Sequence, residues 1–586
     1  MSDAKKDKKK KLSIYEEEKV QSPLRTMVRM FFTRKITILG LSVFGFVVLS
    51  CLILPFFFPT ERLFVDSTQR NLPPSGNFMK FPKTLEGNVR QISAGNAFAA
   101  GIDNDGNVHV WGNLNEGLRA VPEGMGNVVQ VSAGLSHVLA LNDRGEVFTW
   151  GNDRGGVFKL LDIPGEAQEG DIVEIYAGDQ ISVALDSGGD IHVWGNQNIV
   201  SIRASGVRGR VKQIALNNLT AIALLDDATV ACLSIVSVPF DRIPEEIQGR
   251  TVKIASNDKA CIALLDDGTV TAWGLNENGL LDIPENVQGR VKDVAGGRSH
   301  FTALLDDGTV ESWGSNLLKQ ADSPSVSGIE QIAASYYQNY AVDGNGKITT
   351  WGLKGYFFGT DDYGRDIFSR LLAGGRVSLF AGAISIIISS VLGIIIGSIS
   401  GYFGGRVDVL LMRFAEIWSA IPFLPIAIIL SYILAGNLGE VGRLIMTMLI
   451  LGILGWPAIG RLVRAQMLAA RENDYVLAAR AMGVNTRNII FRHIFPNILT
   501  IVAVNLMIRL AGSILSESML SYLGMGIMEP TPTWGNMLSG SQNLTVITVY
   551  WWRWAFAAIF LGLSTLSLNI IGDGVREAID PKASGR

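Results

Sequence analysis

The stretch ITILGLSVFGFVVLSCLILPFFF, from Ile36 to Phe58, contains 23 residues and no charge. About 20 helical residues cross a bilayer core about 30 Å thick, so this stretch predicts a transmembrane helix. It is too long for a removable signal peptide and lacks the small-residue cleavage site of one. Residues 1–35 before it form a basic tail with the run Lys8–Lys11. The positive-inside rule therefore predicts a cytoplasmic tail at residues 1–35, a helix at 36–58 and an external chain after it.

The composition of the rest of the chain also favours a membrane protein over a soluble enzyme. The 586 residues are 48% hydrophobic and only 18% charged. Three cysteines and five histidines, without a paired metal-binding spacing, argue against a metal site. The chain also lacks the glycine-rich Gly-Lys-Ser/Thr string that holds nucleotide phosphates. We therefore expect no catalytic residue and no metal in this chain.

Hydrophobic stretches return after Trp351. They predict further spans, at 377–401, 408–435, 441–458, 498–517 and 551–571. Pro422 and Pro425 predict a kink in the second of these stretches. Residues 459–495 carry six arginines against two acids, whereas residues 518–550 carry no lysine or arginine. The positive-inside rule places the first of these loops in the cytoplasm and the second outside, with both termini cytoplasmic.

Residues 89–354 carry a repeat of about 40 residues. The segment VVQVSAGLSHVLALNDRGEVFTWGN, from Val128, recurs in seven copies. Each copy offers three short alternating stretches separated by turns, which predicts seven three-stranded blades in a β-propeller. The repeated tryptophan is expected to pack between blades. Its positions, of which one is degenerate, are Trp111, Trp150, Trp194, Leu233, Trp273, Trp313 and Trp351.

This repeat resembles the regulator-of-chromosome-condensation family. The pattern is clearest in Ala133-Gly134, His137, Ala140-Leu141 and Trp150-Gly151-Asn152. The resemblance implies a fold and no particular ligand. The predicted fold class is therefore a multi-domain membrane protein. A polytopic bundle of six α-helices carries an all-β, extracytoplasmic propeller (residues 77–356) between its first and second helices.

The cytoplasmic loop 459–496 contains the string RENDYVLAARAMGVNTRNIIFRHIFPN, from Arg471 to Asn497. Ala478-Ala479, Gly483 four residues later and Pro496 resemble the loop by which binding-protein-dependent ABC importers dock on their ATPase subunits. Leu477 departs from that pattern, because the family has Glu there. The resemblance implies a helix–turn–helix that contacts the ATPase. The residues expected to do so are Tyr475, Ala478, Ala479, Arg480, Ala481, Gly483, Val484 and Arg487.

Four further strings resemble the C-type subunits of oligopeptide and dipeptide permeases. The first is Ser22-Pro23 with the basic stretch and the helix after it, and the second is GTDDYGRD from Gly359. The third comprises LSYLGMG from Leu520 and PTPTWGNML from Pro530, and the fourth is NIIGDGVREAIDP from Asn569. The resemblance implies a permease domain of the type I importer class over residues 359–586. The propeller is then an insertion between Leu72-Pro73-Pro74-Ser75-Gly76 and Gly359.

Two charges fall in or near the fifth predicted span. Arg509 lies in its middle and Glu517 near its outer end. A charge at the bilayer centre costs about 2.5–3.5 kcal/mol, so we expect these side chains to pair with another helix or to line the translocation path. The sequence does not decide whether Cys232 and Cys261 pair.

The resemblance implies a membrane permease of an importer for peptides or similar solutes. Its implied partners are a second permease, two ATPase chains that hold ATP and magnesium, an external solute-binding protein and membrane lipid, with no nucleic acid. The propeller is expected to dock the binding protein or to shield the external mouth. A competing hypothesis is a membrane-anchored recognition module in which the propeller does the work. The importer-like loop disfavours this hypothesis, and it also disfavours a stand-alone channel or secondary transporter.

Overall fold

The computed structural model describes residues 31–59, 64–168, 171–196, 202–203, 205–216, 220–435 and 438–579. The chain divides into two compact units. One comprises Asp66–Phe357, and the other combines Met1–Val65 with Phe358–Arg586. Most of the predicted basic tail, with the Ser22-Pro23 string, and the end of the Asn569 string lie outside the described residues.

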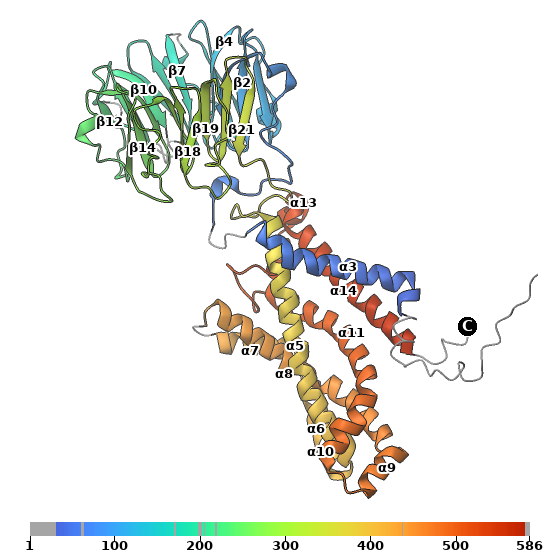
Figure 1. Cartoon of the computed structure of the whole chain (residues 1–586). Coiled ribbons are helices and arrows are strands. Elements are labelled where there is room, and N and C mark those ends of the chain that lie inside the picture. The colour runs from blue at the N-terminus through green and yellow to red at the C-terminus, as the bar shows by residue number, and fades with distance from the viewer. Residues whose placement is uncertain are drawn as a thin grey trace, which may run out of the picture. The chain divides into compact units, whose positions relative to one another are not determined.

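The unit Asp66–Phe357 contains seven antiparallel sheets of three strands each (Figure 1). The first three blades are β1–β3 (Val89–Ala94, Phe98–Asp103, Val108–Gly112), β4–β6 (Val128–Ala133, His137–Asn142, Val147–Gly151) and β7–β9 (Ile172–Ala177, Ile181–Asp186, Ile191–Gly195). The fourth and fifth are β10–β12 (Val211–Leu216, Ala221–Leu225, Val230–Cys232) and β13–β15 (Thr251–Ser256, Ala260–Leu265, Val270–Gly274). The last two are β16–β18 (Val291–Gly296, His300–Leu305, Val310–Gly314) and β19–β21 (Ile329–Ser335, Gln338–Asp343, Ile348–Gly352).

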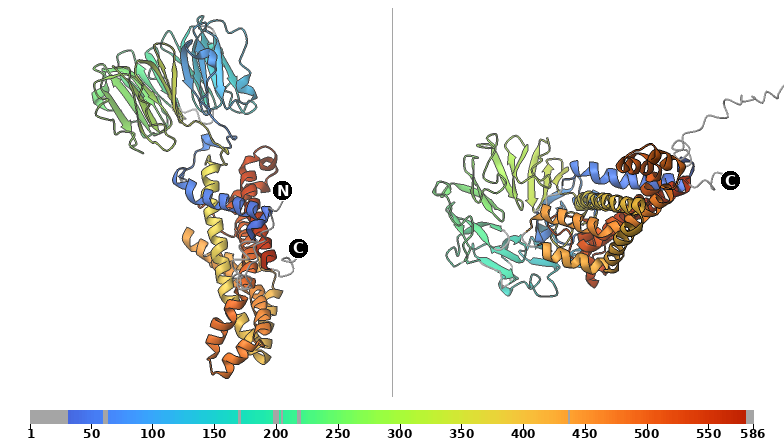
Figure 2. Two further views of the ribbon diagram at one scale, coloured as in Figure 1. Left: turned by 45° about the vertical axis from the view of Figure 1, so that its right-hand side comes forward. Right: turned by 90° about the horizontal axis from the view of Figure 1, so that it is seen from below.

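The innermost strands close a ring. Each contacts the innermost strand of the next blade, and β19 of the last blade contacts β1 of the first (Figure 2). Every blade repeats a register shift at the start of its first strand, such as the one between Val89 and Gln91. Middle strands such as β5 and β17 are buried along their whole length. The seven-bladed propeller predicted from the repeat is therefore confirmed.

The repeated tryptophans are buried between blades. The indole Nε1 of Trp273 donates to the carbonyl oxygen of Phe240 at 3.0 Å, and that of Trp313 donates to Leu280 at 3.2 Å. Trp194 makes the same contact with Leu160 at 3.0 Å. These bonds tie each indole to the segment that leads into its own blade, which confirms the predicted packing role.

The fourth blade is the irregular one, as the degenerate marker at Leu233 suggests. Its third strand, β12, has three residues, against five in the third strand of the other blades. In a regular blade a glycine follows the tryptophan with positive φ, and a Cβ on Gly151 would lie 2.5 Å from the Cα of His137. The fourth blade has Ser234 at that place. Its side chain excludes this conformation, so the strand ends early.

The other unit is helical. Its long helices are α3 (Lys35–Ile53), α5 (Ile367–Phe403), α8 (Glu440–Ala470), α11 (Phe495–Tyr522) and α14 (Trp552–Ile579). The remaining segments of more than three residues are α6 (Gly405–Ala420), α7 (Phe423–Ala435), α9 (Asp474–Ala481), the π-helix η6 (Ile489–Ile494), α12 (Trp534–Leu538), η7 (Ser539–Gln542) and α13 (Leu544–Thr548). Among the residues that the structure describes, five helices are long and apolar enough to cross a membrane, or six if α6 and α7 form one bent span.

The predicted kink lies at Pro422, where α6 and α7 meet at 82°. Pro425 falls in the first turn of α7, where a missing backbone N–H costs no hydrogen bond. Helix α5 begins at Ile367, ten residues before the predicted start of its span. Asp366 explains this early start, because its carboxylate accepts from the backbone N–H of Ser369 at 2.9 Å and caps the helix.

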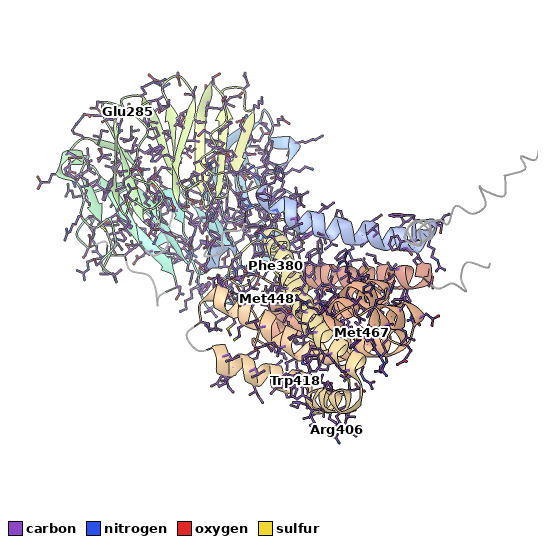
Figure 3. All side chains as sticks on the ribbon, turned by 60° about the horizontal axis from the view of Figure 1, so that its bottom comes forward. Glu285, Phe380, Arg406, Trp418, Met448 and Met467 are labelled. Carbon is purple, nitrogen blue, oxygen red and sulfur yellow. The ribbon has the colours of Figure 1, made fainter. Side chains whose placement is uncertain are left out.

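Helices α5 and α8 pack closely through glycines. A Cβ on Gly393 would lie 2.7 Å from Ile459, and one on Gly397 would lie 2.4 Å from the carbonyl oxygen of Gly460. A Cβ on Gly401 would likewise lie 2.6 Å from the Cβ of Met467, a buried residue that is labelled in Figure 3. These three glycines therefore serve the close packing of the two helices. Gly404 and Gly405 instead have positive φ and turn the chain from α5 into α6.

Candidate functional site

The loop after α8 is fastened to the end of α5. Helix α8 ends at Ala470, and the guanidinium of Arg471 donates to the carbonyl oxygens of Gly401 at 3.3 Å and Tyr402 at 3.4 Å. The guanidinium of Arg480 lies over the Tyr402 ring, 5.6 Å from its centre. A displacement of the loop would therefore also move the end of α5.

Helix α9 has one face in the core and one face outside. Val476 and Ala479 are buried in a cluster with Met467 and Ile494. Tyr475, Leu477 and Ala478 are exposed, as are Arg480 and Ala481. Asp474 in the first turn and Arg480 in the last turn complement the helix dipole.

A glycine ends α9. The backbone N–H of Gly483 donates to the carbonyl oxygen of Arg480 at 3.0 Å, and the backbone N–H of Val484 donates to the carbonyl oxygen of Ala479 at 3.1 Å. This pair of bonds, with φ of +77° at Gly483, is a Schellman motif. Half-buried Val484 packs on the cluster that contains Ala479, which completes the motif.

The chain then enters the membrane helix through a short helical segment. The side chain of Asn485 caps α10 (Thr486–Asn488) by accepting from the N–H of Asn488 at 2.8 Å. One turn of π-helix follows, with Ile489, Ile490 and Ile494 buried, and α11 begins with Pro496 in its first turn. The predicted helix–turn–helix that continues into a membrane helix is therefore present.

The exposed residues of α9 and the turn after it form one surface, which includes most of the predicted coupling residues. We name this surface the α9 face; it consists of Tyr475, Leu477, Ala478, Arg480, Ala481, Met482, Gly483 and Arg487. Of the predicted residues, Ala479 and Val484 lie instead on the side that packs on the bundle. Leu477 and Met482 were not among the predicted residues, although both are exposed, Met482 by 76%. The position of the apolar Met482 directly before the turn glycine, Gly483, could have indicated that its side chain is exposed.

Charged residues also gather at the other end of α5, in the GTDDYGRD string. Arg365 pairs with Asp361 at 2.7 Å and with Glu529 at 2.7 Å, and Arg370 pairs with Glu529 at 2.8 Å. Glu529 follows α11, so these pairs join the start of α5 to the loop that follows α11. The indole of Trp534 is buried beside them and donates to the carbonyl oxygen of Leu371 at 3.1 Å. Both strings were recognisable in the sequence, but their contact was not.

Glu517 lies inside the helical bundle. Its side chain is fully buried, and it accepts hydrogen bonds from Ser521 at 2.7 Å and Ser518 at 3.3 Å. These contacts favour a role in helix packing over a place on the translocation path.

Arg509 lies on a different face of α11. It is half-buried, and its Nε has no hydrogen-bond partner among the described residues. The structure therefore does not bring Arg509 and Glu517 together.

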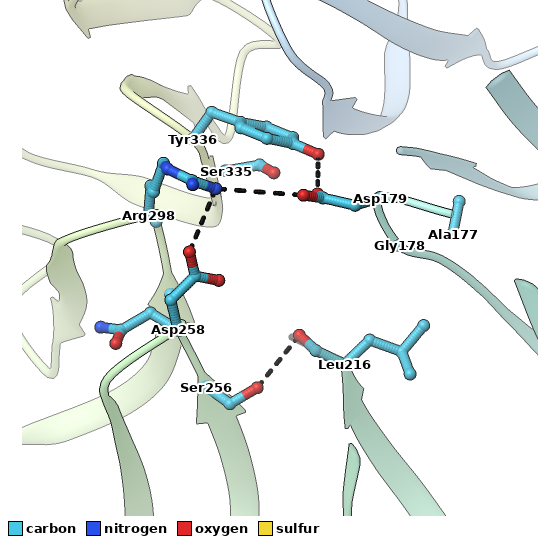
Figure 4. A pocket seen from close by; sticks show the side chains of 12 residues that line it. Ala177, Gly178, Asp179, Leu216, Ser256, Asp258, Arg298, Ser335 and Tyr336 are labelled. Carbon is cyan, nitrogen blue, oxygen red and sulfur yellow. Dashed lines mark hydrogen bonds and ion pairs between the residues drawn. The ribbon is translucent and has the colours of Figure 1, made fainter. Parts of the chain in front are cut away.

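In the propeller, a cluster of charged residues lies where the first strands of several blades end (Figure 4). Arg298 pairs with Asp66 at 2.9 Å and with Asp258 at 3.1 Å, and lies 4.0 Å from Asp179. The hydroxyl of Tyr336 donates to Asp179. Burial raises the pKa of Asp179 to about 6, although Tyr336 and Arg298 oppose the shift. The cluster borders a cavity of about 80 Å³ and ties the fifth and sixth blades to the segment that precedes the first.

Cys232 and Cys261 lie in one apolar cluster between the fourth and fifth blades, and both are free thiols in the structure. Within the described ranges, no group of three or more His, Cys, Asp or Glu side chains is placed to hold a metal ion.

Comparison with known proteins assigns the two units separately. Residues 393–585 match the family described as binding-protein-dependent transport system inner membrane component. Residues 22–74 match the N-terminal transmembrane domain of oligopeptide transport permease C. The regulator of chromosome condensation repeat matches residues 89–117, 128–156, 251–280 and 291–320.

Individual relatives agree with the family matches. The chain is 42% identical over 232 residues to the oligopeptide transport system permease protein OppC of Haemophilus influenzae, which is 39% of this chain and 72% of that protein. It is 36% identical over 227 residues to the dipeptide transport system permease protein DppC of Bacillus subtilis, covering 39% of this chain and 69% of that protein. A likeness to the CRINKLY WD40 ectodomain of the Arabidopsis thaliana receptor kinase ACR4 has 19% identity and a TM-score of 0.36, over 45% of this chain and 98% of that one. The chain therefore belongs to the binding-protein-dependent ABC transport permeases, in the oligopeptide and dipeptide C-type group, and carries an inserted propeller of chromosome-condensation-regulator repeats.

Proposed function

We propose that this chain forms one half of the translocation path of an importer for peptides or similar solutes. A second permease supplies the other half, two ATPase subunits drive the cycle, and an extracytoplasmic binding protein delivers the solute. The names of the relatives support this choice of solute, since they are oligopeptide and dipeptide transport permeases. The chain has no catalytic role of its own, because ATP and magnesium belong to the ATPase subunits, and it binds lipid but no nucleic acid.

The α9 face is the observation that carries the proposal. It presents small and basic residues around Ala478 and an exposed apolar side chain at Met482, while Val476 and Ala479 hold the helix on the bundle. An ATPase that closes on ATP would displace α9. Arg471 and Arg480 would pass this movement to the end of α5, and the π-helical turn would pass it to α11.

The membrane orientation is part of the same proposal. Both termini and the α9 face lie in the cytoplasm, and the propeller lies outside, in agreement with the distribution of arginines. In this orientation the propeller is placed to dock the solute-binding protein or to shield the external mouth. The propeller is inserted between two helices, and the permease motifs on either side of it are intact. This arrangement supports an accessory role for the propeller.

The first test is affinity purification of the tagged chain from native membranes in mild detergent, with mass spectrometry of the proteins that accompany it. We expect a second permease and two P-loop ATPases. Recovery of the chain alone, or only with external partners of the propeller, would contradict the importer and favour an anchored recognition module.

The α9 face gives a sharper test. Met482→Glu places a charge on the proposed contact without touching the core, so ATP hydrolysis stimulated by loaded binding protein should fall at least tenfold. Met482→Leu preserves the apolar contact and should retain activity. Equal activities for the two variants would show that the ATPase does not contact this face.

A further inference from the structure

Helix α6 buries little of its surface within this chain. It lies at the margin of the helical unit in Figure 3, where Arg406 and Trp418 mark its two ends. Among its sixteen residues, all of which the structure describes, Ala415 alone is buried. Exposed apolar side chains cover much of the helix, at Val409, Leu410, Phe414 and Ile417. Little apolar area thus fixes α6 on its neighbours α5 and α8, so its position depends on polar contacts.

One carboxylate joins α6 to both of these neighbours. Asp408 lies in the first turn of α6, and its Oδ1 accepts from the hydroxyl of Ser400 on α5 at 2.5 Å. The guanidinium of Arg464 on α8 donates from Nε to Oδ1 at 2.5 Å and from Nη2 to Oδ2 at 2.6 Å. Such a paired, charge-assisted contact fixes the relative orientation of the two groups as well as their distance. We name Ser400, Asp408 and Arg464 the Asp408 joint.

Two further contacts tie α6 to α8. The guanidinium of Arg461, one turn before Arg464, donates to the hydroxyl of Ser419 at 3.0 Å. The ring of Phe414 stacks on that of Trp456, with the ring centres 6.1 Å apart. Helix α8 therefore supplies a partner at the start, in the middle and near the end of α6. A movement of α8 would carry α6 with it.

Helix α8 leads directly to the α9 face. Arg464 lies six residues, or about 9 Å, before the end of α8 at Ala470, and α9 follows soon after. Both ends of α6 are suited to turning, because α6 begins at Gly404 and Gly405 and meets α7 at 82°. Residues at the ends of an element absorb the dihedral changes of a hinge. A directed contact with α8 between two hinges makes α6 a lever that α8 can move.

We infer that the Asp408 joint moves α6 when the ATPase subunits displace α9, and that this movement couples ATP hydrolysis to passage of the solute. The inference rests on the proposed function and extends it, because it adds a route through α8 and α6 to the routes that lead to α5 and α11. Arg464 and Asp408 act here as positioning residues. Their pairing determines how far α6 follows α8, whereas docking of the ATPase stays with the α9 face.

The test uses the complete importer, with its own binding protein, reconstituted in liposomes. The probe is a mixture of random tetrapeptides, whose uptake is measured by mass spectrometry, and ATP hydrolysis is measured by phosphate release in the same sample. The readout is the number of peptides taken up per ATP hydrolysed in response to loaded binding protein. A purely structural defect lowers the number of working importers, which reduces both rates equally and leaves this ratio unchanged.

Arg464→Gln and Asp408→Asn should each lower the ratio about tenfold, since α9 still receives the ATPase while α6 no longer follows α8. Arg464→Lys should give an intermediate ratio, because an ammonium group keeps the charge without the paired donors. Exchange of the two residues, Asp408→Arg together with Arg464→Asp, should recover most of the ratio. Arg413→Gln is the matched control, since Arg413 is 75% exposed and pairs with Glu416 on the surface of α6. Its ratio should match that of the unaltered importer.

An unchanged ratio in Arg464→Gln and Asp408→Asn would overturn the inference, even where both rates fall together. A ratio in the exchange variant as low as in the single variants would also overturn it, because the pairing itself would then not matter. Failure of the proposed function has a separate signature: the unaltered importer would neither take up peptides nor hydrolyse ATP in response to loaded binding protein. Recovery of each variant with both ATPases shows that it has assembled before its ratio is compared.

Discussion

Gly483 is the residue on which the shape of the α9 face depends. Its φ is +77°, and the space around its Cα is open, so only the backbone conformation opposes a side chain there. Gly483→Ala should cost about 1 kcal/mol in the turn and lower binding-protein-stimulated ATP hydrolysis up to about fivefold. Gly562→Ala is the control, because Gly562 lies in α14 with equally open space and helical φ. Equal hydrolysis in both variants would contradict this role for the turn.

Two buried histidines make the propeller sensitive to acid. His137 and His300 are fully buried, and burial lowers the pKa of each to about 4. The folded propeller therefore holds these protons less tightly than the unfolded chain, and acidification from pH 6.5 toward pH 4 lowers the free energy of unfolding. The loss amounts to about 2 kcal/mol per histidine at pH 5.

This dependence can be measured on the full chain in detergent. Hydrogen exchange of propeller peptides is followed at increasing urea concentrations. The readout is the urea concentration at which half of the propeller is unfolded. His137→Gln or His300→Gln should lower stability at pH 7 but flatten its decline between pH 7 and pH 5. His493→Gln, outside the propeller, should leave the decline unchanged. An identical slope in all three variants would show that other groups control acid unfolding.

At the scale of elements, the contact of α5 with α8 is the most extensive one between the described helices of the membrane unit. The backbone of one helix lies against that of the other at Gly397, where even a methyl group would meet the carbonyl oxygen of Gly460. Gly397→Leu should therefore separate the helices, cost several kcal/mol and lower the yield of folded protein in the membrane. Thermal unfolding of the purified chain checks this expectation. A melting temperature equal to that of Gly562→Leu would refute it.

The existence of the helices could be predicted from sequence, but their rotation about their own axes could not. Tyr475 to Arg487 were selected because they resemble a docking loop, and most of them are exposed. Ala479 is buried because the cluster around Met467 and Ile494 fixes which side of α9 faces inward. That cluster joins residues from several helices, so local sequence does not reveal it. The same reason separates Glu517, which is fully buried, from Arg509, which is half-buried.

At the scale of the molecule, the propeller is an inserted domain whose two chain ends lie next to each other. The N–H of Ser75 donates to the carbonyl oxygen of Tyr356 at 2.9 Å, so deletion of residues 77–356 joins positions that are already neighbours. We expect the shortened chain to assemble with its partners but to take up solute more slowly at low concentrations of binding protein. The dependence of uptake on binding-protein concentration checks this. Unchanged uptake would exclude a docking or shielding role.

The repeat predicted the propeller because each blade is specified locally and seven similar blades close a ring. The centre of that ring was not predictable in the same way. Arg298, Asp66, Asp179 and Asp258 come from four separate places in the chain and meet only after the ring closes. Asp179, Asp258 and Arg298 occupy the same position of the repeat, two residues before the second strand of their blades, but the residue type at this position changes from blade to blade. The repeat therefore does not predict the cluster.

The packing of α3 has a consequence for the timing of synthesis. Its partner is α14, since Gly40 lies against Ile570 and Thr37 against Gly574. The first helix of the bundle thus packs against the last, and the whole propeller is translated between them. At about 5–20 residues per second the propeller alone occupies the ribosome for about 15–60 s. During that interval α3 must remain in the bilayer unaccompanied, which its uncharged stretch from Ile36 to Phe58 allows.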